Sequence, residues 1–85
     1  MKDDIRAVLV EHGRLTRPVD TLADEADLYQ AGMTSHASVN VMLALEGRLG
    51  IEFPDRMLRR SVFESVASIK AAIEELKASH PRAQP

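Results

Sequence analysis

Cysteine and tryptophan are absent from this chain of 85 residues, and its aromatic residues amount to one tyrosine and two phenylalanines. Without cysteine, neither a disulfide framework nor a zinc site built on thiolates is possible. With so few rings, the core has to come from aliphatic side chains and four methionines, within a hydrophobic content of 45%. This length and composition indicate one small domain.

Long apolar runs and an excess of positive charge are missing as well. No stretch approaches the ~20 apolar residues that a membrane span needs, and the N-terminal sequence lacks the segments of a signal peptide. Eleven basic and thirteen acidic side chains give a net charge of −2, and no segment forms the basic stripe that binding to a nucleic-acid backbone requires. We therefore expect a cytoplasmic monomer that binds neither membranes nor nucleic acid.

A first helix is predicted over residues 3–12, where Asp3 or Asp4 can cap the N-terminus and Gly13 ends the helix. Its apolar stripe follows helical spacing and consists of Ile5, Val8, Leu9 and His12. Residues 14–34 then form a connection that is unusually long for a compact domain, which indicates a functional loop or a short helix within it. Its anchors to the core are predicted to be Leu15, Val19 and Leu22.

A second helix is predicted over residues 35–49, with Ser35 as a candidate N-cap and Gly50 at its end. One face carries Val39, Met42, Leu43 and Leu49, and the adjacent face carries Val41 and Leu45. A helix that is apolar over so much of its circumference needs more than one neighbour. It is expected to be the central helix of a bundle, and part of its surface is free to meet a partner.

Two further helices are predicted after an extended crossover over residues 51–54. The first is short, spans residues 55–60, is capped by Asp55, and directs Met57 and Leu58 inward. The second is capped by Ser65 and has a stripe of apolar residues at helical spacing, namely Val66, Ile69, Ile73 and Leu76. The spacing of Glu74 and Lys77 on it predicts a weak ion pair.

These elements predict an all-α fold, a small up-down four-helix bundle with three main helices, one short third helix and a long first loop. Residues 1–78 form the domain, and residues 79–85 are expected to be a flexible C-terminal tail. A bundle of this kind does not by itself define a function. The function therefore has to be argued from particular residues.

The segment from Asp27 to Ser35 is the most informative part of the chain. An acidic residue and Leu28 lead into a loop, Gly32 permits a sharp turn, and a serine stands at the start of an apolar helix. A hydroxyl at that corner is exposed and ordered, so a modifying enzyme can reach it. The positive end of the helix dipole also favours a phosphodiester formed there.

This segment resembles the modification site of acyl carrier proteins, in which the serine carries 4′-phosphopantetheine and the thiol of that arm carries the cargo. The resemblance runs from about Ile5 to Leu76. It includes the motifs Met42-Leu43-Ala44-Leu45-Glu46, Gly50-Ile51-Glu52-Phe53-Pro54-Asp55 and Phe63-Glu64-Ser65-Val66 with Ile69, in the family's order and spacing. It implies that Ser35 is the attachment residue and that Met33 anchors the loop.

Two departures from the common family pattern indicate a specialised carrier. Thr34-Ser35-His36 stands where many members have Asp-Ser-Leu, and residues 36–50 carry one acid and one base instead of an acidic surface. The chain looks most similar to stand-alone carriers that receive an amino acid from ligases resembling the catalytic core of class II seryl-tRNA synthetases. The resemblance implies three partners: a phosphopantetheinyl transferase, a loading ligase and a downstream acceptor enzyme.

Several of these residues also have simpler structural interpretations. Ser35 can be a helix cap only, and Ser38 and Thr34 are competing hydroxyls in positions that suit modification less well. His36 cannot act as a base for its neighbour on a helix, and three scattered histidines make no metal site. Asp27 is expected to cap the turn. The candidate partner contacts are Met33, Thr34, His36, Val39, Arg56, Arg59 and Arg60.

The three arginines leave two interpretations open: a solvated face, or contact with a phosphate or an acidic partner. For the whole chain, the main interpretation is a non-catalytic carrier of amino acids, with a carrier of acyl groups for fatty acid or polyketide synthesis as an alternative. An unmodified helical docking module is the other alternative. A DNA-binding domain is disfavoured by the charge, and an enzyme by the lack of a nucleophile, base and acid set.

Overall fold

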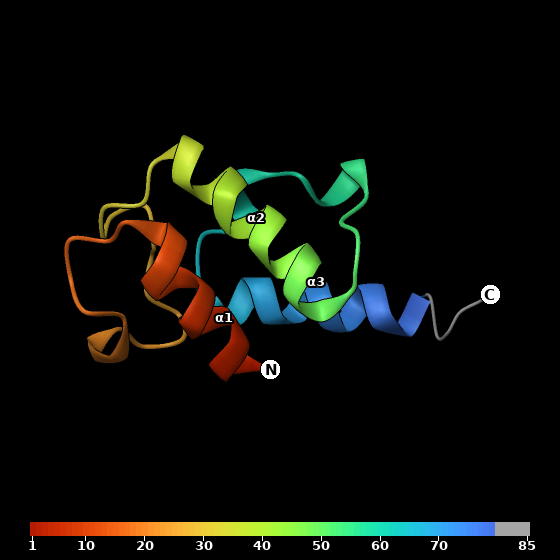
Figure 1. Ribbon diagram of the computed structural model, residues 1–85, viewed down its shortest axis with the longest axis horizontal. Coiled ribbons are helices and arrows are strands. Elements are labelled where there is room, and N and C mark those ends of the chain that lie inside the picture. The colour runs from red at the N-terminus through yellow and green to blue at the C-terminus, as the bar shows by residue number, and fades with distance from the viewer. Residues whose placement is uncertain (80–85) are drawn as a thin grey trace.

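The computed structural model describes residues 1–79, and within them every regular element is helical (Figure 1). The main helices are α1 (Lys2–Val8), α2 (Ser35–Leu49) and α3 (Val66–Ser79). Short turns of helix join them: a π-helical turn η1 (Leu9–Gly13) and the 3₁₀ turns η2 (Val19–Thr21), η3 (Asp55–Met57) and η4 (Arg60–Val62). The predicted all-α bundle with three main helices and a long first loop is confirmed.

The first helix differs from its prediction at both ends. It starts at Lys2, and no side chain caps it. Asp4 was one of two candidate caps, but its carboxylate pairs with Arg48 of α2 at 2.9 Å, and this hydrogen bond lowers the pKa of Asp4. The helix continues into η1, which ends at Gly13, and the residue that follows, Arg14, adopts a left-handed conformation with φ of 55°. His12 is only half-buried, so it is not part of the core.

The inward face of α2 is the one that carries Val41 and Leu45, one of the two apolar faces that the sequence distinguished. Ala37, Val41 and Leu45 are buried, whereas Val39 and Leu43 are 50% and 54% exposed. The buried residues follow a strict i, i+4, i+8 spacing, and the small Ala37 at one end of this row is fully buried. Two large apolar residues of the adjacent face, Val39 and Leu43, are therefore left at the surface of the helix.

Gly50 ends α2 as predicted. Its φ of 66° is left-handed, and its amide donates to the carbonyl of Glu46. Phe53 follows in the crossover, where its amide donates to the Glu46 carboxylate at 2.9 Å. Its ring packs edge-on against Phe63 with centroids 5.4 Å apart, so the crossover is held to both α2 and the segment before α3.

The predicted short helix over residues 55–60 is replaced by the two separate turns η3 and η4. Arg59 between them is extended, with φ of −128° and ψ of 150°, so the helical hydrogen bonds cannot continue through it. Asp55 makes no capping hydrogen bond. Met57 is buried as predicted, but Leu58 was wrongly assigned to the interior and is 47% exposed.

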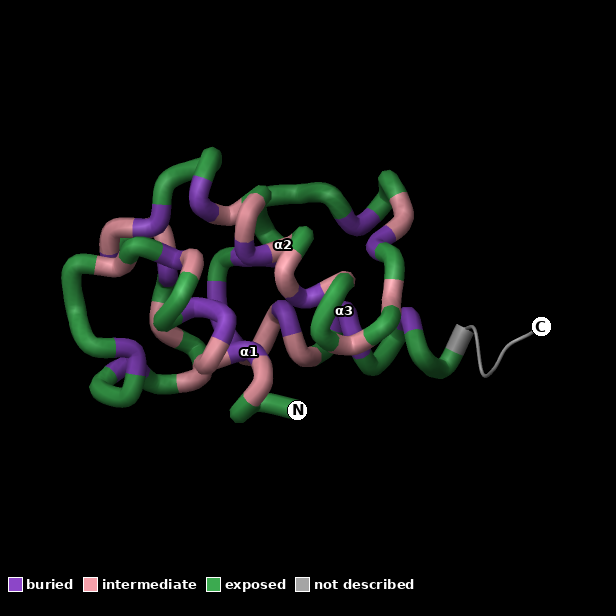
Figure 2. Tube along the Cα trace, in the orientation of Figure 1, coloured by how far each residue is buried: buried purple, intermediate pink, exposed green. Residues whose placement is uncertain are grey.

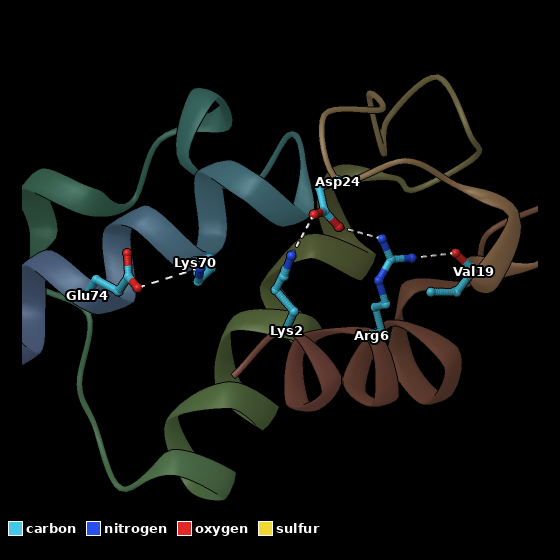
Figure 3. Close-up of polar contacts among 6 residues, drawn as sticks. All are labelled: Lys2, Arg6, Val19, Asp24, Lys70 and Glu74. Atoms are coloured by element: carbon cyan, nitrogen blue, oxygen red, sulfur yellow. Dashed lines mark hydrogen bonds and ion pairs between the residues drawn. The ribbon is translucent and has the colours of Figure 1, made fainter.

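The start of α3 is held by a reciprocal cap, which confirms the assignment of Ser65. The Ser68 amide donates to the Ser65 hydroxyl at 3.0 Å, and the Ser65 amide donates to the Ser68 hydroxyl at 3.1 Å. Farther along, Glu74 pairs with Lys70 at 3.7 Å (Figure 3) and not with the expected Lys77. The helix includes Ser79, and the rest of the predicted tail lies outside the described residues.

The long loop from residue 14 to residue 34 is fixed by backbone hydrogen bonds to other parts of the fold. The amide of Thr16 donates to the carbonyl of Ala31 at 2.8 Å, which draws the two ends of the loop together. The amide of Leu28 donates to Glu64, and the amide of Ala67 donates to Asp24. The loop is therefore an ordered part of the structure, docked at the start of α3.

Side chains of α1 hold the same loop from the other side (Figure 3). Arg6 donates to the Asp24 carboxylate at 2.6 Å and to the Val19 carbonyl at 2.8 Å, and Lys2 donates to Asp24 at 2.9 Å. The hydrogen bonds from Lys2 and Arg6 lower the pKa of the Asp24 carboxyl. As predicted, Val19 and Leu22 are buried, and Leu15 packs partly against the core.

The buried residues form one core between the three helices, with the loop contributing to it at its left-hand end (Figure 2). Its largest fully buried side chains are aliphatic, and they include Ile5, Leu9, Leu28, Leu45, Ile69 and Ile73. Among residues 1–79, no helix is long and apolar enough to cross a membrane. The same residues contain no cluster of three side chains suited to holding a metal ion.

Candidate attachment site at Ser35

The turn that leads to Ser35 is built on Asp27. Its carboxylate accepts hydrogen bonds from the amides of Tyr29 at 2.9 Å and Gln30 at 3.3 Å, so its predicted role as a turn cap is confirmed. Leu28 is fully buried, and the amide of Met33 donates to its carbonyl at 3.0 Å. This pairing closes the turn onto the core.

Met33 anchors the loop, as predicted, because its side chain lies in the core with 2% exposure. The same burial rules it out as a surface contact for a partner, which was its second predicted role. The neighbouring Gly32 has φ of 115°, and a Cβ placed on it would lie 2.9 Å from both the amide nitrogen and Cγ2 of Thr16. Only glycine fits the turn at this position.

Thr34, and not Ser35, is the N-cap of α2. Thr34 has an extended backbone with ψ of 166°, and its hydroxyl accepts a hydrogen bond from the Ala37 amide at 3.0 Å. Ser35 is the first residue inside the helix. The prediction of Ser35 as a cap is therefore wrong, because the capping hydroxyl has to come from the residue with the non-helical backbone.

The three hydroxyls around this corner have different surroundings. The Thr34 hydroxyl accepts the capping hydrogen bond from the Ala37 amide, and the Ser38 hydroxyl donates to the Ser35 carbonyl at 2.7 Å. Ser35 is exposed, and its hydroxyl makes no hydrogen bond with any residue in the described part of the chain. It is thus the hydroxyl most accessible to a modifying enzyme.

His36 is exposed next to Ser35, and its ring has no hydrogen-bond partner among residues 1–79. The two side chains do not form a nucleophile and base pair, and no carboxylate orients the ring. His36 therefore offers a surface beside the hydroxyl. Val39, one turn farther along α2, is half exposed on the same helix.

A groove of about 430 Å³ runs beside Ser35. One wall is formed by residues of α2, namely Ser35, Ser38, Val39 and Met42. The other is formed by the segment that precedes α3, through Leu58, Arg59, Arg60 and Phe63. Tyr29 from the loop adds to its lining. The groove thus combines an apolar surface with two guanidinium groups beside a free hydroxyl.

The three arginines predicted as one cluster have separate environments. Arg56 pairs with Glu75 of α3 at 2.7 Å and does not line the groove. Arg60 stacks on the ring of Tyr29, with its guanidinium carbon 3.9 Å from the ring centroid. The side chain of Arg59 has no hydrogen-bond or ion-pair partner in the part of the chain that the structure describes.

A larger hollow of about 670 Å³ lies between α1, η1 and the start of the loop. It shares no residue with the groove at Ser35 and contains none of the predicted site residues. Arg6 in its wall is already bonded to Asp24 and Val19. Size alone therefore does not identify the functional site, and the smaller groove has the free hydroxyl and the unpaired cation.

Residues 6–76 match the family described as the phosphopantetheine attachment site, and the chain belongs to that family. It is a carrier protein, and the cofactor of its family is 4′-phosphopantetheine, held covalently. The resemblance drawn from the motifs around Ser35 is thus confirmed. The match covers all three main helices except the first residues of α1 and the last of α3.

The chain is 49% identical to an aminoacyl carrier protein of Agrobacterium fabrum over 74 residues, which are 87% of this chain and 89% of the relative. Among solved structures, it is similar to the carrier protein of Agrobacterium tumefaciens in complex with an engineered Bradyrhizobium japonicum glycine:[carrier protein] ligase and AMP. That match has a TM-score of 0.85 and 49% identity, and it covers 87% of this chain and 99% of the other.

A solution structure of an Agrobacterium tumefaciens protein is also similar, with a TM-score of 0.75 and 46% identity. This match covers 93% of the chain and 95% of the other protein. Both structural matches span nearly the whole of the matched chains, and the similarity therefore concerns the complete fold.

Three features of the site were missed from the sequence. The stacking of Arg60 on Tyr29 joins residues 31 positions apart, and no local pattern reveals such a pair. The cap by Thr34 did have a signal, because threonine is a preferred N-cap residue and stands directly before the helix. Leu58 and Phe63 were predicted only as core or motif residues, and they prove to line the groove.

Proposed function

We propose that Ser35 carries 4′-phosphopantetheine and that the protein presents an amino acid, bound to this arm, to partner enzymes. The free, exposed hydroxyl of Ser35 at the start of α2 is the observation that carries this proposal. The surroundings fit the group: the groove beside the hydroxyl offers apolar lining and cationic side chains for an arm that begins with a phosphodiester. The positive end of the α2 dipole favours the same anion.

When bound, the arm supplies a terminal thiol at the end of a long flexible chain, to which an amino acid is held as a thioester. The protein's own residues provide the fixed corner from which the arm extends. Thr34 caps α2, Gly32 and Thr16 fix the turn, and Met33 anchors it in the core. These contacts keep the Ser35 hydroxyl on the surface, where a transferase can reach it.

An amino acid is the cargo that the similarities favour over a fatty acyl or polyketide chain. One relative with 49% identity is an aminoacyl carrier protein, and another is seen in complex with a glycine:[carrier protein] ligase. The α2 surface of this chain supports the same choice, because residues 36–50 hold only Glu46 and Arg48 as charged residues. It lacks the acidic character used for docking by carriers of fatty acid synthesis.

The partners that follow from this function are a phosphopantetheinyl transferase, an amino acid:[carrier protein] ligase and an enzyme that accepts the amino acid. The chain itself is proposed to be non-catalytic. His36 and Val39 beside Ser35 are proposed to be surface contacts for these partners, since both are exposed on α2. Thr34 is exposed too, but its hydroxyl serves the helix cap.

The test of attachment is intact mass spectrometry after incubation with coenzyme A, Mg²⁺ and a phosphopantetheinyl transferase of broad specificity. We expect one phosphopantetheine on the wild type and none on Ser35→Ala. Thr34→Ala and Ser38→Ala are matched controls, and both should be modified. Modification of Ser35→Ala, or none of the wild type with several transferases, would refute the assignment.

The test of cargo uses the protein that already carries the arm. It is incubated with ATP, a glycine:[carrier protein] ligase and single amino acids from a panel that includes glycine and alanine. We expect a mass increase of one aminoacyl group that hydroxylamine removes, as it does for thioesters. No acylation by any amino acid, while a fatty acyl:carrier ligase loads the same protein, would replace the aminoacyl cargo with an acyl one.

A further inference from the structure

Arg59 is set apart from the other arginines by its place in the fold. It lies with Leu58 between η3 and η4, and its backbone is extended, so it belongs to neither short turn. Arg56 forms an ion pair with Glu75, and Arg60 stacks on the ring of Tyr29. Within residues 1–79, Arg59 is an exposed arginine whose guanidinium has no partner and which lines the groove beside Ser35.

The charges that line the groove are all positive. Its lining consists of nine residues, of which Arg59 and Arg60 are the charged ones, and no acidic side chain is among them. Glu46, the acid of α2, is bonded to the Phe53 amide and does not line the groove. The groove therefore presents an uncompensated cation on the wall that faces α2, where the Ser35 hydroxyl lies.

This inference rests on the proposed attachment at Ser35. We propose that Arg59 is a positioning residue that binds the phosphodiester at the root of the arm on Ser35. A phosphodiester bears one negative charge, and a guanidinium group can donate two parallel hydrogen bonds to its two free oxygens. Because the arm is covalently fixed to the same groove, the contact needs no separate binding event and its effective concentration is high.

Arg60 and Tyr29 have a supporting part in this arrangement. Their stacked side chains join the loop to η4 across the groove lining and keep Arg60 in place. Arg59 is thereby left, among residues 1–79, as the groove cation without a partner, and it is available to bind the phosphate. The remaining lining at Val39, Met42 and Leu58 is apolar, so the arm leaves the phosphate along a surface without competing charges.

The test is a comparison of the protein before and after arm attachment by NMR, with the protein labelled with ¹⁵N. The Nε–Hε signals of Arg59 and Arg56 are identified from the variants Arg59→Gln and Arg56→Gln. We expect attachment to shift the Arg59 signal and to leave the Arg56 signal unchanged. No shift of Arg59 in protein that mass spectrometry shows to be fully modified would overturn the inference.

A second measurement follows the phosphate itself through ³¹P relaxation of the modified protein. In Arg59→Gln the phosphodiester should become more mobile, because it loses its contact with the guanidinium group. The contact is exposed, so the population of the bound phosphate should change by no more than about fivefold. Arg56→Gln should match the wild type, and Arg59→Lys should restore part of the restraint. Equal relaxation in the wild type and in Arg59→Gln would also overturn the inference.

Failure of the proposed function gives a different result from failure of this inference. If Ser35 is not the attachment residue, Ser35→Ala acquires the arm or the wild type does not, and mass spectrometry reports this before any NMR comparison. If the arm is on Ser35 and Arg59 responds only when the ligase is added, the arginine is a partner contact and not a phosphate contact. That outcome also overturns the inference.

Discussion

The hydroxyl of Thr34 accepts a hydrogen bond from the amide of Ala37 at 3.0 Å, and it thereby caps the helix that Ser35 begins. Two adjacent residues with hydroxyl groups thus have different roles at the start of α2. Thr34 stabilises the helix end, and the hydroxyl of Ser35 stays free of hydrogen bonds within the described residues. Stability and modification should therefore respond to different substitutions.

Thr34→Ala is expected to lower the free energy of unfolding by about 1 kcal/mol, because the Ala37 amide loses its acceptor. Ser35→Ala should leave the free energy of unfolding nearly unchanged and abolish arm attachment. Urea denaturation followed by circular dichroism gives the first quantity, and intact mass gives the second. A Ser35→Ala protein destabilised as much as Thr34→Ala would contradict the division of roles.

Gly32→Ala is expected to destabilise the fold by about 1–3 kcal/mol, since it combines a left-handed φ with a collision against Thr16. Two other glycines are controls. Gly50→Ala has open space but φ of 66°, so it should lose about 1 kcal/mol. Gly47→Ala lies in the middle of α2 with open space and should gain about 0.5–1 kcal/mol. Thermal unfolding of the three variants checks this order.

The orientation of α2 predicts opposite results for two of its leucines. Leu45→Ala should lower the free energy of unfolding by about 2–5 kcal/mol, because Leu45 is fully buried. Leu43→Ala should change it by less than about 0.5 kcal/mol, because Leu43 is half exposed. Chemical denaturation of both variants is the measurement, and equal losses would mean that the helix is rotated from the described orientation.

The ion pairs of Asp24 predict a dependence of stability on pH. The pKa of Asp24 is lowered from 3.8 in the folded protein by hydrogen bonds from Lys2 and Arg6. As the pH falls through 3.8 and below, the unfolded chain takes up its proton first, so stability is lost in that range and is fully present above it. Urea midpoints measured from pH 7 to pH 3 should show this loss.

Asp24→Asn should be less stable than the wild type at pH 7, and the difference should shrink as the pH falls below 4. Asp20→Asn is the control, because Asp20 is an exposed carboxylate of the same loop without an ion pair among residues 1–79. It should stay close to the wild type throughout. A constant difference between Asp24→Asn and the wild type at every pH would refute the role of the ion pairs.

Features encoded by neighbouring residues could be predicted from the sequence. The cap at Ser65, the stop at Gly50, the turn at Asp27 and the anchor at Met33 each depend on residues within a few positions of one another. Local chemistry decides them, because the hydrogen bonds run between residues close in the chain. The position of Ser35 beside an exposed corner followed from the same kind of signal.

Features decided by packing could not be predicted. The buried face of α2 depends on which neighbours reach it, and two apolar faces in the sequence left that choice open. Leu58 was wrongly assigned to the interior for the same reason, because its burial depends on residues far away in the chain. Asp4, a candidate helix cap in the sequence, is instead the ion-pair partner of Arg48, which is 44 residues away. The separation of the three arginines also depends on distant residues, since Glu75 and Tyr29 decide which of them stays free.

The loop before Ser35 is held by bonds between main-chain atoms, through Thr16 to Ala31, Leu28 to Glu64 and Ala67 to Asp24. Such bonds do not depend on which side chain a residue carries. Exposed positions of this loop whose side chains make no hydrogen bond within residues 1–79, such as Glu25 and Gln30, can therefore accept new side chains while the corner that holds Ser35 keeps its shape. Evolution can alter the surface that partner enzymes recognise without altering the geometry of attachment.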